Sequence, residues 1–296
     1  MQNKEIVRIN SLKVQFGDFT ALNITEPITI ERGDRLGIIG SNGAGKTTLV
    51  KALLKVVKSR GDVQMNVPME KIAVHMQQNG YTNLLKVEDI METVLGCKLK
   101  DHKKAMELVE FFNFKSSLNK KFQHLSGGQQ QRLTLILVLS QESELVIFDE
   151  VTTGLDFVTR QELMELLKKW YKGKDTSICY ITHYYEELEN MSNKLLLLDK
   201  GRVIDYGRQD ELFKKYCGNG IIIIENNEKN SQLAEDFKQI SSVAKEIALS
   251  FNNYDEEIAI IKRLAQNGVD YKRSSTDIEI MYTNAIKTWE ENYEAV

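Results

Sequence analysis

The sequence predicts an α/β fold, and three patterns among its 296 residues carry that prediction. Apolar runs at residues 35–39, 144–148 and 177–181 are typical of strands that are buried on both faces of a sheet. Each run is followed by polar or glycine-rich residues and then by a helical pattern. Strands that alternate with helices in this way predict a mostly parallel sheet with crossover connections.

The remaining elements surround this core in chain order. Residues 6–9 and 12–16 alternate with a period of two, which predicts short antiparallel strands, and helix-spaced apolar positions across 86–118 predict a helical insertion. Residues 195–199 and 203–206 flank a Lys-Gly-Arg turn and predict a hairpin. A short helix over 209–216 is expected to close this part of the chain.

A change in charge suggests a domain boundary near residue 220. Residues 225–296 contain 14 acidic and 8 basic residues, whereas the preceding 224 contain 28 acidic and 31 basic residues. We therefore predict a first domain over 1–218 and a small α+β extension over 219–296. Within the extension we expect a strand at 221–224 and helices over 231–251 and 259–266.

Composition excludes several classes of protein. The three cysteines are far apart and lack the spacing of metal ligands, which argues against a disulfide framework or a cysteine metal site. Neither part of the chain is basic enough to indicate a nucleic-acid surface, so no nucleic-acid partner is expected. The apolar runs are far shorter than the roughly 20 residues of a membrane helix, and no signal peptide is evident. These observations predict a cytoplasmic protein.

A phosphate-binding loop is the most specific motif. Residues 40–47 read GSNGAGKT and match G-x-x-x-x-G-K-[ST] between a predicted strand and a predicted helix over 48–58. Glycines let the backbone N–H groups approach phosphates closely, Lys46 adds a positive charge and Thr47 offers a hydroxyl to Mg²⁺. The alternative is a chance glycine-rich turn. The predicted ATP-binding residues here are Gly40, Ser41, Asn42, Gly43, Ala44, Gly45, Lys46, Thr47 and Thr48.

Two carboxylates follow the apolar run at 145–148. Asp149 and Glu150 stand where the strand emerges, at the edge of an α/β sheet where ligands bind. Asp149 suits a magnesium ligand and Glu150 a base for an attacking water. The alternative for Glu150 is a solvated loop carboxylate.

Residues 125–132 read LSGGQQQR and precede an apolar helix. Ser126 suits the cap of that helix, and Gly127 and Gly128 leave its amino terminus open to a phosphate. The segment resembles the signature motif of the ATP-binding cassette (ABC) ATPases, although alone it is equally a capped helix start. The resemblance covers about residues 4–216 and implies a phosphate-loop NTPase fold with a mostly parallel core sheet, an antiparallel β subdomain and a helical subdomain.

The resemblance assigns further residues and partners. Phe16 is similar to the aromatic that stacks on adenine, Gln77 to a glutamine that contacts Mg²⁺ and the γ-phosphate, Asp156 to the aspartate after the catalytic loop, and His183 to the switch histidine. Gln78 is an alternative register for Gln77. Ser126, Gly127, Gly128 and Gln129 would contact ATP held by a second copy of the chain, in a head-to-tail dimer. Residues 79–95 would face a separate transmembrane permease, which would hold the protein at the cytoplasmic face of the membrane.

One departure from the family pattern stands beside the base, because Val151 occupies a position that is usually proline. No catalytic position is missing, so ATP hydrolysis with Mg²⁺ is expected.

The segments 260–269 and 277–281 resemble the extension of ATPases that serve ABC-2-type exporters, and an exporter subunit is the leading expectation. The alternatives are an importer ATPase, or a protein that acts on ribosomes or DNA. The extension either regulates the protein or only stabilises a dimer.

Overall fold

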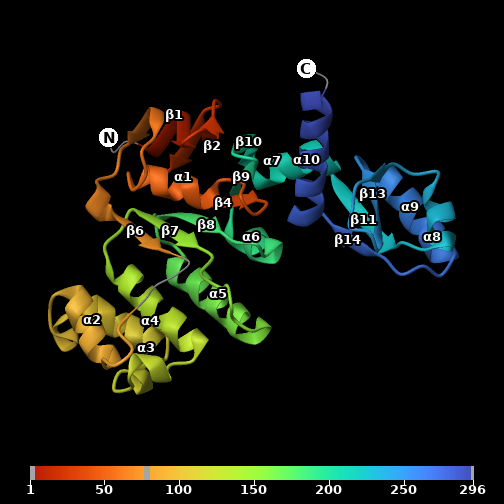
Figure 1. The fold of residues 1–296 in the computed structure, drawn as a ribbon. Coiled ribbons are helices and arrows are strands. Elements are labelled where there is room, and N and C mark those ends of the chain that lie inside the picture. Colours follow the sequence, from red (N-terminus) through yellow and green to blue (C-terminus); the bar gives the residue numbers. More distant parts are fainter. Residues whose placement is uncertain (1–3, 77–80, 295–296) are drawn as a thin grey trace.

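The computed structural model describes residues 4–76 and 81–294, and these residues form three sheets (Figure 1). The first sheet is antiparallel, with β1 in its centre paired to the three other strands. Its strands are β1 (Glu5–Phe16), β2 (Phe19–Ile24), β3 (Ile28–Glu31) and β5 (Arg60–Met65). This sheet agrees with the period-two pattern at the amino terminus.

The second sheet has six strands in the order β10-β9-β4-β8-β7-β6. All neighbours are parallel except β10 and β9, which form the expected antiparallel hairpin. Its strands are β4 (Arg35–Gly40), β6 (Ile72–His75), β7 (Leu145–Asp149), β8 (Ser177–Ile181), β9 (Lys194–Asp199) and β10 (Arg202–Arg208). The mostly parallel core predicted from the apolar runs is confirmed.

Helices cover this sheet and form a separate layer beside it (Figure 1). The helices that belong to the crossovers and to the end of this unit are α1 (Lys46–Leu53), α5 (Phe157–Tyr171), α6 (Tyr185–Met191) and α7 (Gln209–Cys217). The helical insertion expected over 86–118 contains α2 (Val87–Leu95) and α3 (Lys103–Phe111), and α4 (Gly127–Ser140) is the apolar helix expected after residues 125–132. Single 3₁₀ turns lie at Met69–Lys71, Leu99–Asp101, Lys115–Ser117 and Phe122–His124.

The helix predicted over 48–58 is shorter than expected. It ends at Leu53, because Lys55 adopts a left-handed conformation with φ of 58° and its N–H donates to the carbonyl of Ala52. The chain turns there toward β5 instead of continuing the helix.

The extension forms the third sheet, with the order β12-β13-β11-β14 and antiparallel pairing throughout. Its elements are β11 (Gly220–Glu225), α8 (Glu228–Ala234), β12 (Gln239–Ile240), β13 (Glu246–Phe251), α9 (Tyr254–Gln266), β14 (Lys272–Ser274) and α10 (Ile278–Glu294). The division of the chain at residue 218 stays a prediction, although this sheet begins at Gly220.

The helix predicted over 231–251 is wrong. Only α8 is helical there, and β13 pairs with β11 along its whole length, with Ile247 opposite Ile224 and Phe251 opposite Gly220. A short apolar run does not by itself distinguish a strand from a helix, and here the neighbouring strand decides. Gly220 is required at its position, because an added Cβ would lie 2.3 Å from the Phe251 ring.

The last helix returns to the first part of the chain. In Figure 1, α10 stands between the six-stranded sheet and the sheet of the extension. The Tyr282 hydroxyl donates to the Leu198 carbonyl at 3.1 Å, and the N–H of Ile278 donates to Glu189 in α6 at 3.1 Å. The extension therefore packs directly on β9 and α6.

The described residues contain no helix whose length and apolar character would allow it to cross a membrane.

His75 connects the six-stranded sheet to the helical layer. Its side chain is fully buried at the end of β6, and its Nε2 lies 2.9 Å from the Gln131 amide oxygen in α4. Burial lowers the pKa of the imidazole to about 4, and the hydrogen bond to Gln131 opposes that shift only in part. Among the described residues, Nδ1 is one of the few buried side-chain atoms that lack a hydrogen-bond partner.

This buried imidazole predicts a loss of stability in mild acid. In the unfolded chain this imidazole binds a proton as the pH falls below its ordinary pKa of 6.5, whereas in the folded chain it stays neutral until the pH nears 4. The free energy of unfolding therefore falls as the pH falls. Between pH 7 and pH 5 the loss from this group is about 2 kcal/mol. Urea unfolding should show that His75→Val loses less stability over this interval than the wild type.

The exposed His124 provides the control, because water surrounds its side chain in both states. His124→Val should keep the wild-type pH dependence, and equal losses in His75→Val and wild type would contradict the prediction.

Candidate active site

The phosphate loop, residues 40–47, connects the carboxyl end of β4 to the amino end of α1. Its backbone needs glycine at two positions, since Gly43 and Gly45 have φ of 83° and 99°. At Gly45 a Cβ would also lie 3.0 Å from the Ala21 carbonyl oxygen. The loop therefore leaves its N–H groups and the helix end open toward an anion.

Lys46 is folded back along this loop. Its side chain is mostly buried, and Nζ donates to the carbonyl oxygens of Gly40 at 2.7 Å and Ser41 at 3.0 Å. Burial lowers the pKa of Lys46, while the charges of Glu150 and Asp149 act in the opposite direction. A second contact fixes the loop from the other side, because the Ser41 hydroxyl donates to Asp199 at 2.9 Å.

Asp149 and Thr47 lie together beneath the loop. The Thr47 hydroxyl donates to Oδ2 of Asp149 at 3.2 Å, and only 1% of Asp149 is exposed. Burial raises the pKa of this carboxyl group, whereas the bond from Thr47 lowers it. A cation bound between a desolvated carboxylate and a hydroxyl would stabilise the charged form of the carboxylate.

Glu150 and His183 are in direct contact with each other. Oε1 of Glu150 lies 2.7 Å from Nε2 of His183, and the Thr153 hydroxyl donates to the other carboxylate oxygen at 3.2 Å. The two residues follow neighbouring parallel strands, in which Asp149 is paired with Ile181. Glu150 adopts a left-handed φ of 53°, an uncommon conformation for a non-glycine residue. This backbone turn aims its side chain toward His183.

An open cavity of about 430 Å³ joins these groups to two aromatic rings. Phe16 and Phe19 are both largely exposed and stand at the end of the β1–β2 hairpin. Phe19 is absent from the residues predicted from sequence. The sequence does contain a feature that predicts its position, because Phe16 and Phe19 flank a tight Gly-Asp turn and would therefore lie side by side. The cavity is lined by Phe16, Phe19, Ala21, Asn42, Gly43, Ala44, Gly45, Lys46, Thr47, Thr48, Glu150 and His183.

The signature residues lie elsewhere. Ser126 caps α4 as predicted, with its hydroxyl accepting from the N–H of Gln129 at 3.3 Å while Gln129 accepts from the N–H of Ser126 at 3.1 Å. Gly128 lets α4 approach α5, because a Cβ there would lie 2.7 Å from Thr159. None of the described signature residues lines the cavity beside the phosphate loop.

Asp156 belongs to the same edge as the signature segment. It caps α5 by accepting from the N–H of Thr159 at 3.1 Å and from its hydroxyl at 2.7 Å, and these bonds lower the pKa of the carboxyl group. Gln77 and its alternative Gln78 lie outside the described residues. The predicted residues thus fall into two groups, one at the phosphate loop and one where α4 meets α5.

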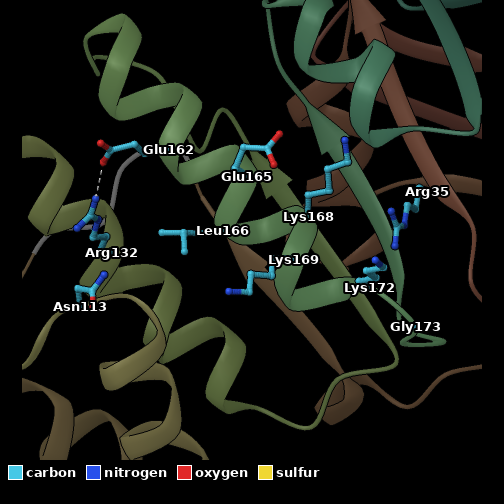
Figure 2. Close-up of a pocket in the computed structure, with 10 residues that line it drawn as sticks. All are labelled: Arg35, Asn113, Arg132, Glu162, Glu165, Leu166, Lys168, Lys169, Lys172 and Gly173. Atoms are coloured by element: carbon cyan, nitrogen blue, oxygen red, sulfur yellow. Dashed lines mark hydrogen bonds and ion pairs between the residues drawn. The ribbon is translucent and has the colours of Figure 1, made fainter.

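A larger cavity of about 900 Å³ lies along α5, between Arg132 in α4 and Arg35 at the start of β4 (Figure 2). Arg35, which lines it, opens β4, so this cavity is at the end of the parallel strands opposite the phosphate loop. Several of its cations already have partners: Arg132 contacts Glu162 at 3.1 Å, and Arg35 donates to the Tyr171 carbonyl at 3.2 Å. In open α/β sheets ligands bind at the carboxyl ends of the strands, which makes the smaller cavity the candidate site.

Comparison with known proteins agrees with this geometry. The family model described as ABC transporter matches residues 27–153. The protein cbiO1 of Clostridium perfringens, described as part of the ABC transporter complex cbiONQ, superposes with a TM-score of 0.63 at 25% identity. That match covers 72% of this chain and 92% of cbiO1.

Two curated relatives differ in the direction of transport that their names state. The methionine import ATP-binding protein MetN of Lactobacillus acidophilus is 28% identical, over 88% of this chain and 82% of its own length. The Nod factor export ATP-binding protein I of Cupriavidus pinatubonensis is also 28% identical, over 75% of this chain and 72% of its own. The longer match favours the importer alternative over the expected exporter. The structure and these matches together identify the chain as an ATP-hydrolysing protein of the ABC transporter family.

Proposed function

We propose that this chain is the ATPase subunit of an ABC importer, with the nucleotide bound in the cavity beside the phosphate loop. The observation that carries the chemistry is the contact of 2.7 Å between Glu150 and His183 at the rim of that cavity. A paired carboxylate and imidazole beside a phosphate-binding loop suit the attack of water on a phosphoryl group.

The proposed reaction is an in-line displacement. Glu150 accepts the proton of the attacking water, and His183 keeps the carboxylate oriented and contacts the γ-phosphate. Lys46 exchanges its two carbonyl contacts for phosphate oxygens, and the N–H groups of the phosphate loop stabilise the charge that develops on them. The bond from the γ-phosphorus to its leaving oxygen breaks, which yields ADP and inorganic phosphate.

Thr47 and Asp149 fit a magnesium ion. Both offer oxygen donors, and the buried carboxylate lacks a cationic hydrogen-bond partner among the contacts of the described residues. Mg²⁺ commonly takes one or two protein oxygens together with phosphate oxygens and water, and it would neutralise charge on the bound phosphates. Gln77 is the further donor proposed for this ion.

The signature group serves a second nucleotide in this proposal. Ser126, Gly127, Gly128, Gln129 and Asp156 stand at an edge that does not line the cavity of their own chain. Two copies related by a two-fold axis would bring each signature segment to the partner's phosphate loop, so that both sites are completed at once.

Import is favoured over export by the extent of the match. Residues 1–218 make up about three quarters of the chain, so a match to an import protein over 88% includes part of the extension. A match over 75% to an export protein requires only a few residues of it. We propose an organic solute of the methionine type as cargo, and we propose that the extension either regulates the cassette or stabilises the dimer.

A patch on the helical layer suits the transmembrane partner. Leu84, Leu85 and Val94 are exposed apolar side chains within the segment predicted to face the permease. Binding of this patch would keep the subunit at the cytoplasmic face of the membrane.

Phe16 is expected to stack on adenine, and Phe19 stands close enough in the same cavity to share that role. Phe16→Ala should raise the Kd for ATP about tenfold, because stacking of a base on an aromatic ring contributes about 1–3 kcal/mol. Phe19→Ala should raise it by a smaller factor. Titration with a fluorescent ATP analogue measures both.

Tyr254→Ala in the extension is the control, since it removes another exposed aromatic ring far along the chain. An unchanged Kd in Phe16→Ala would reject the stacking role of that residue.

Glu150→Gln is expected to bind ATP but to hydrolyse it at least about 100-fold more slowly, because the amide cannot accept the proton of the water. The variant should accumulate as an ATP-bound dimer, which size-exclusion chromatography detects. Glu165→Gln, an exposed change on α5, should keep wild-type turnover. Unchanged steady-state hydrolysis in Glu150→Gln would exclude this residue as the base.

Import is tested with a transmembrane permease that co-purifies with this chain. Proteoliposomes that contain both proteins and enclose ATP should accumulate external methionine or a related solute. Leu84→Asp should abolish both uptake and co-purification, because a desolvated charge opposes packing on an apolar partner. Its basal ATPase activity should remain.

Val56→Asp is the matched control, since Val56 is as exposed as Leu84 and follows α1 instead of lying on the patch. Release of preloaded solute from proteoliposomes that enclose ATP, without uptake, would establish export instead.

A further inference from the structure

Glu187 is a buried carboxylate four residues after His183. It contacts neither the phosphate loop nor the signature segment. It lies in the first turn of α6, and only 6% of the residue is exposed. Removing a carboxylate from water is costly unless hydrogen bonds and a cation replace the lost hydration. The buried Glu187 carboxylate therefore needs polar partners within the protein.

Its two oxygens bind two different loops. Oε1 accepts from the Thr152 hydroxyl at 2.8 Å, and Oε2 accepts from the Thr182 hydroxyl at 2.8 Å. Thr152 follows Glu150 by two residues, and Thr182 directly precedes His183. One carboxylate thus bridges the loop of the base and the loop of its histidine partner.

A third element supplies the positive charge. Nε of Arg160, in α5, lies 3.8 Å from Oε1 of Glu187, and its guanidinium carbon stands 3.7 Å above the centre of the Tyr184 ring. That Nε is buried and has no hydrogen-bond partner, so the nearby carboxylate compensates its charge without a direct hydrogen bond. Arg160 follows Asp156 by one helical turn, and its own N–H donates to the Asp156 carbonyl.

We propose that Glu187 is a positioning residue for ATP hydrolysis: its carboxylate holds the Glu150 and His183 loops in register and connects both to the amino end of α5. Glu187 does not touch the cavity that would hold ATP, so it acts through Glu150 and His183. This inference rests on the proposed hydrolysis at Glu150.

The geometry predicts an effect on turnover and little effect on binding. Thr152 and Thr182 are buried and do not themselves line the cavity, so ATP should bind normally when the bridge is broken. The contact of 2.7 Å between Glu150 and His183 depends on both loops, and displacements of about 1 Å in a catalytic group cost as much as 100-fold in rate.

The test uses the full chain and a pair of substitutions at Thr152. Thr152→Val removes the hydroxyl and keeps the shape, and kcat should fall about tenfold while KM for ATP stays within twofold. Thr152→Ser keeps the hydroxyl and should restore kcat to within about twofold of wild type. Glu187→Gln preserves the shape but not the charge facing Arg160, and it should lower kcat as well. It supplies a second measurement if Thr152→Val does not fold.

Glu186→Gln is the matched control, because it changes the exposed neighbour of Glu187 on the same helix and should leave kcat unchanged. A double substitution gives the decisive comparison. In the Glu150→Gln background, Thr152→Val should lower the residual rate less than twofold, because the group it positions is already lost.

Equal kcat in wild type, Thr152→Val and Glu187→Gln would overturn the inference and leave the proposed function intact. An undiminished tenfold loss in the Glu150→Gln background would also overturn it, since the bridge would then act independently of the base. A wild-type chain that binds ATP without hydrolysing it would instead refute the proposed function.

Discussion

The parallel register of β4, β8 and β7 is the constraint on which the rest of the structure depends. Ile38 pairs with Ile181, and Ile181 pairs with Asp149, so the phosphate loop, the Glu150 and His183 side chains and the buried Asp149 all leave the sheet at one edge. These strands are buried on both faces, and a slip of one residue would turn every side chain to the opposite face. The hydrophobic core therefore also sets the geometry of the site.

Polar contacts carry this geometry from the sheet to the loops. Ser41 binds Asp199 at the end of β9, Thr47 binds Asp149 at the end of β7, and Glu187 binds Thr152 and Thr182. Each of these hydrogen bonds joins two different loops or elements of the chain. In a site that must hold a water, a phosphate and a carboxylate in line, these restraints limit the motion that the loops would otherwise have.

The helical layer contacts α5, and the extension contacts α6, the helix that carries Glu187. Gly128 brings α4 against Thr159 in α5, the helix that also carries Arg160. Glu189, two residues after Glu187 in α6, accepts from the backbone of Ile278 at the start of α10. The helix whose Glu187 contacts the Glu150 and His183 loops is thus in direct contact with the extension, which places α6 between the two parts of the chain.

The sequence by itself determined the parallel core, the phosphate loop, the carboxylates Asp149 and Glu150, and the cap at Ser126. These features depend on local order along the chain: an apolar run followed by a loop, or a capping residue followed three positions later by glutamine. It also located His183 through the family resemblance, and the structure brings that residue to Glu150.

Only the tertiary structure decided the contacts that depend on distant partners. Residues 246–251 are a strand because β11 lies beside them, and Phe19 reaches the cavity because the β1–β2 hairpin folds over the phosphate loop. The bridge through Glu187 joins positions 152, 182 and 187 with Arg160, and no spacing along the chain distinguishes that carboxylate from its exposed neighbour Glu186. Its role follows from burial, and burial is a property of the packed molecule.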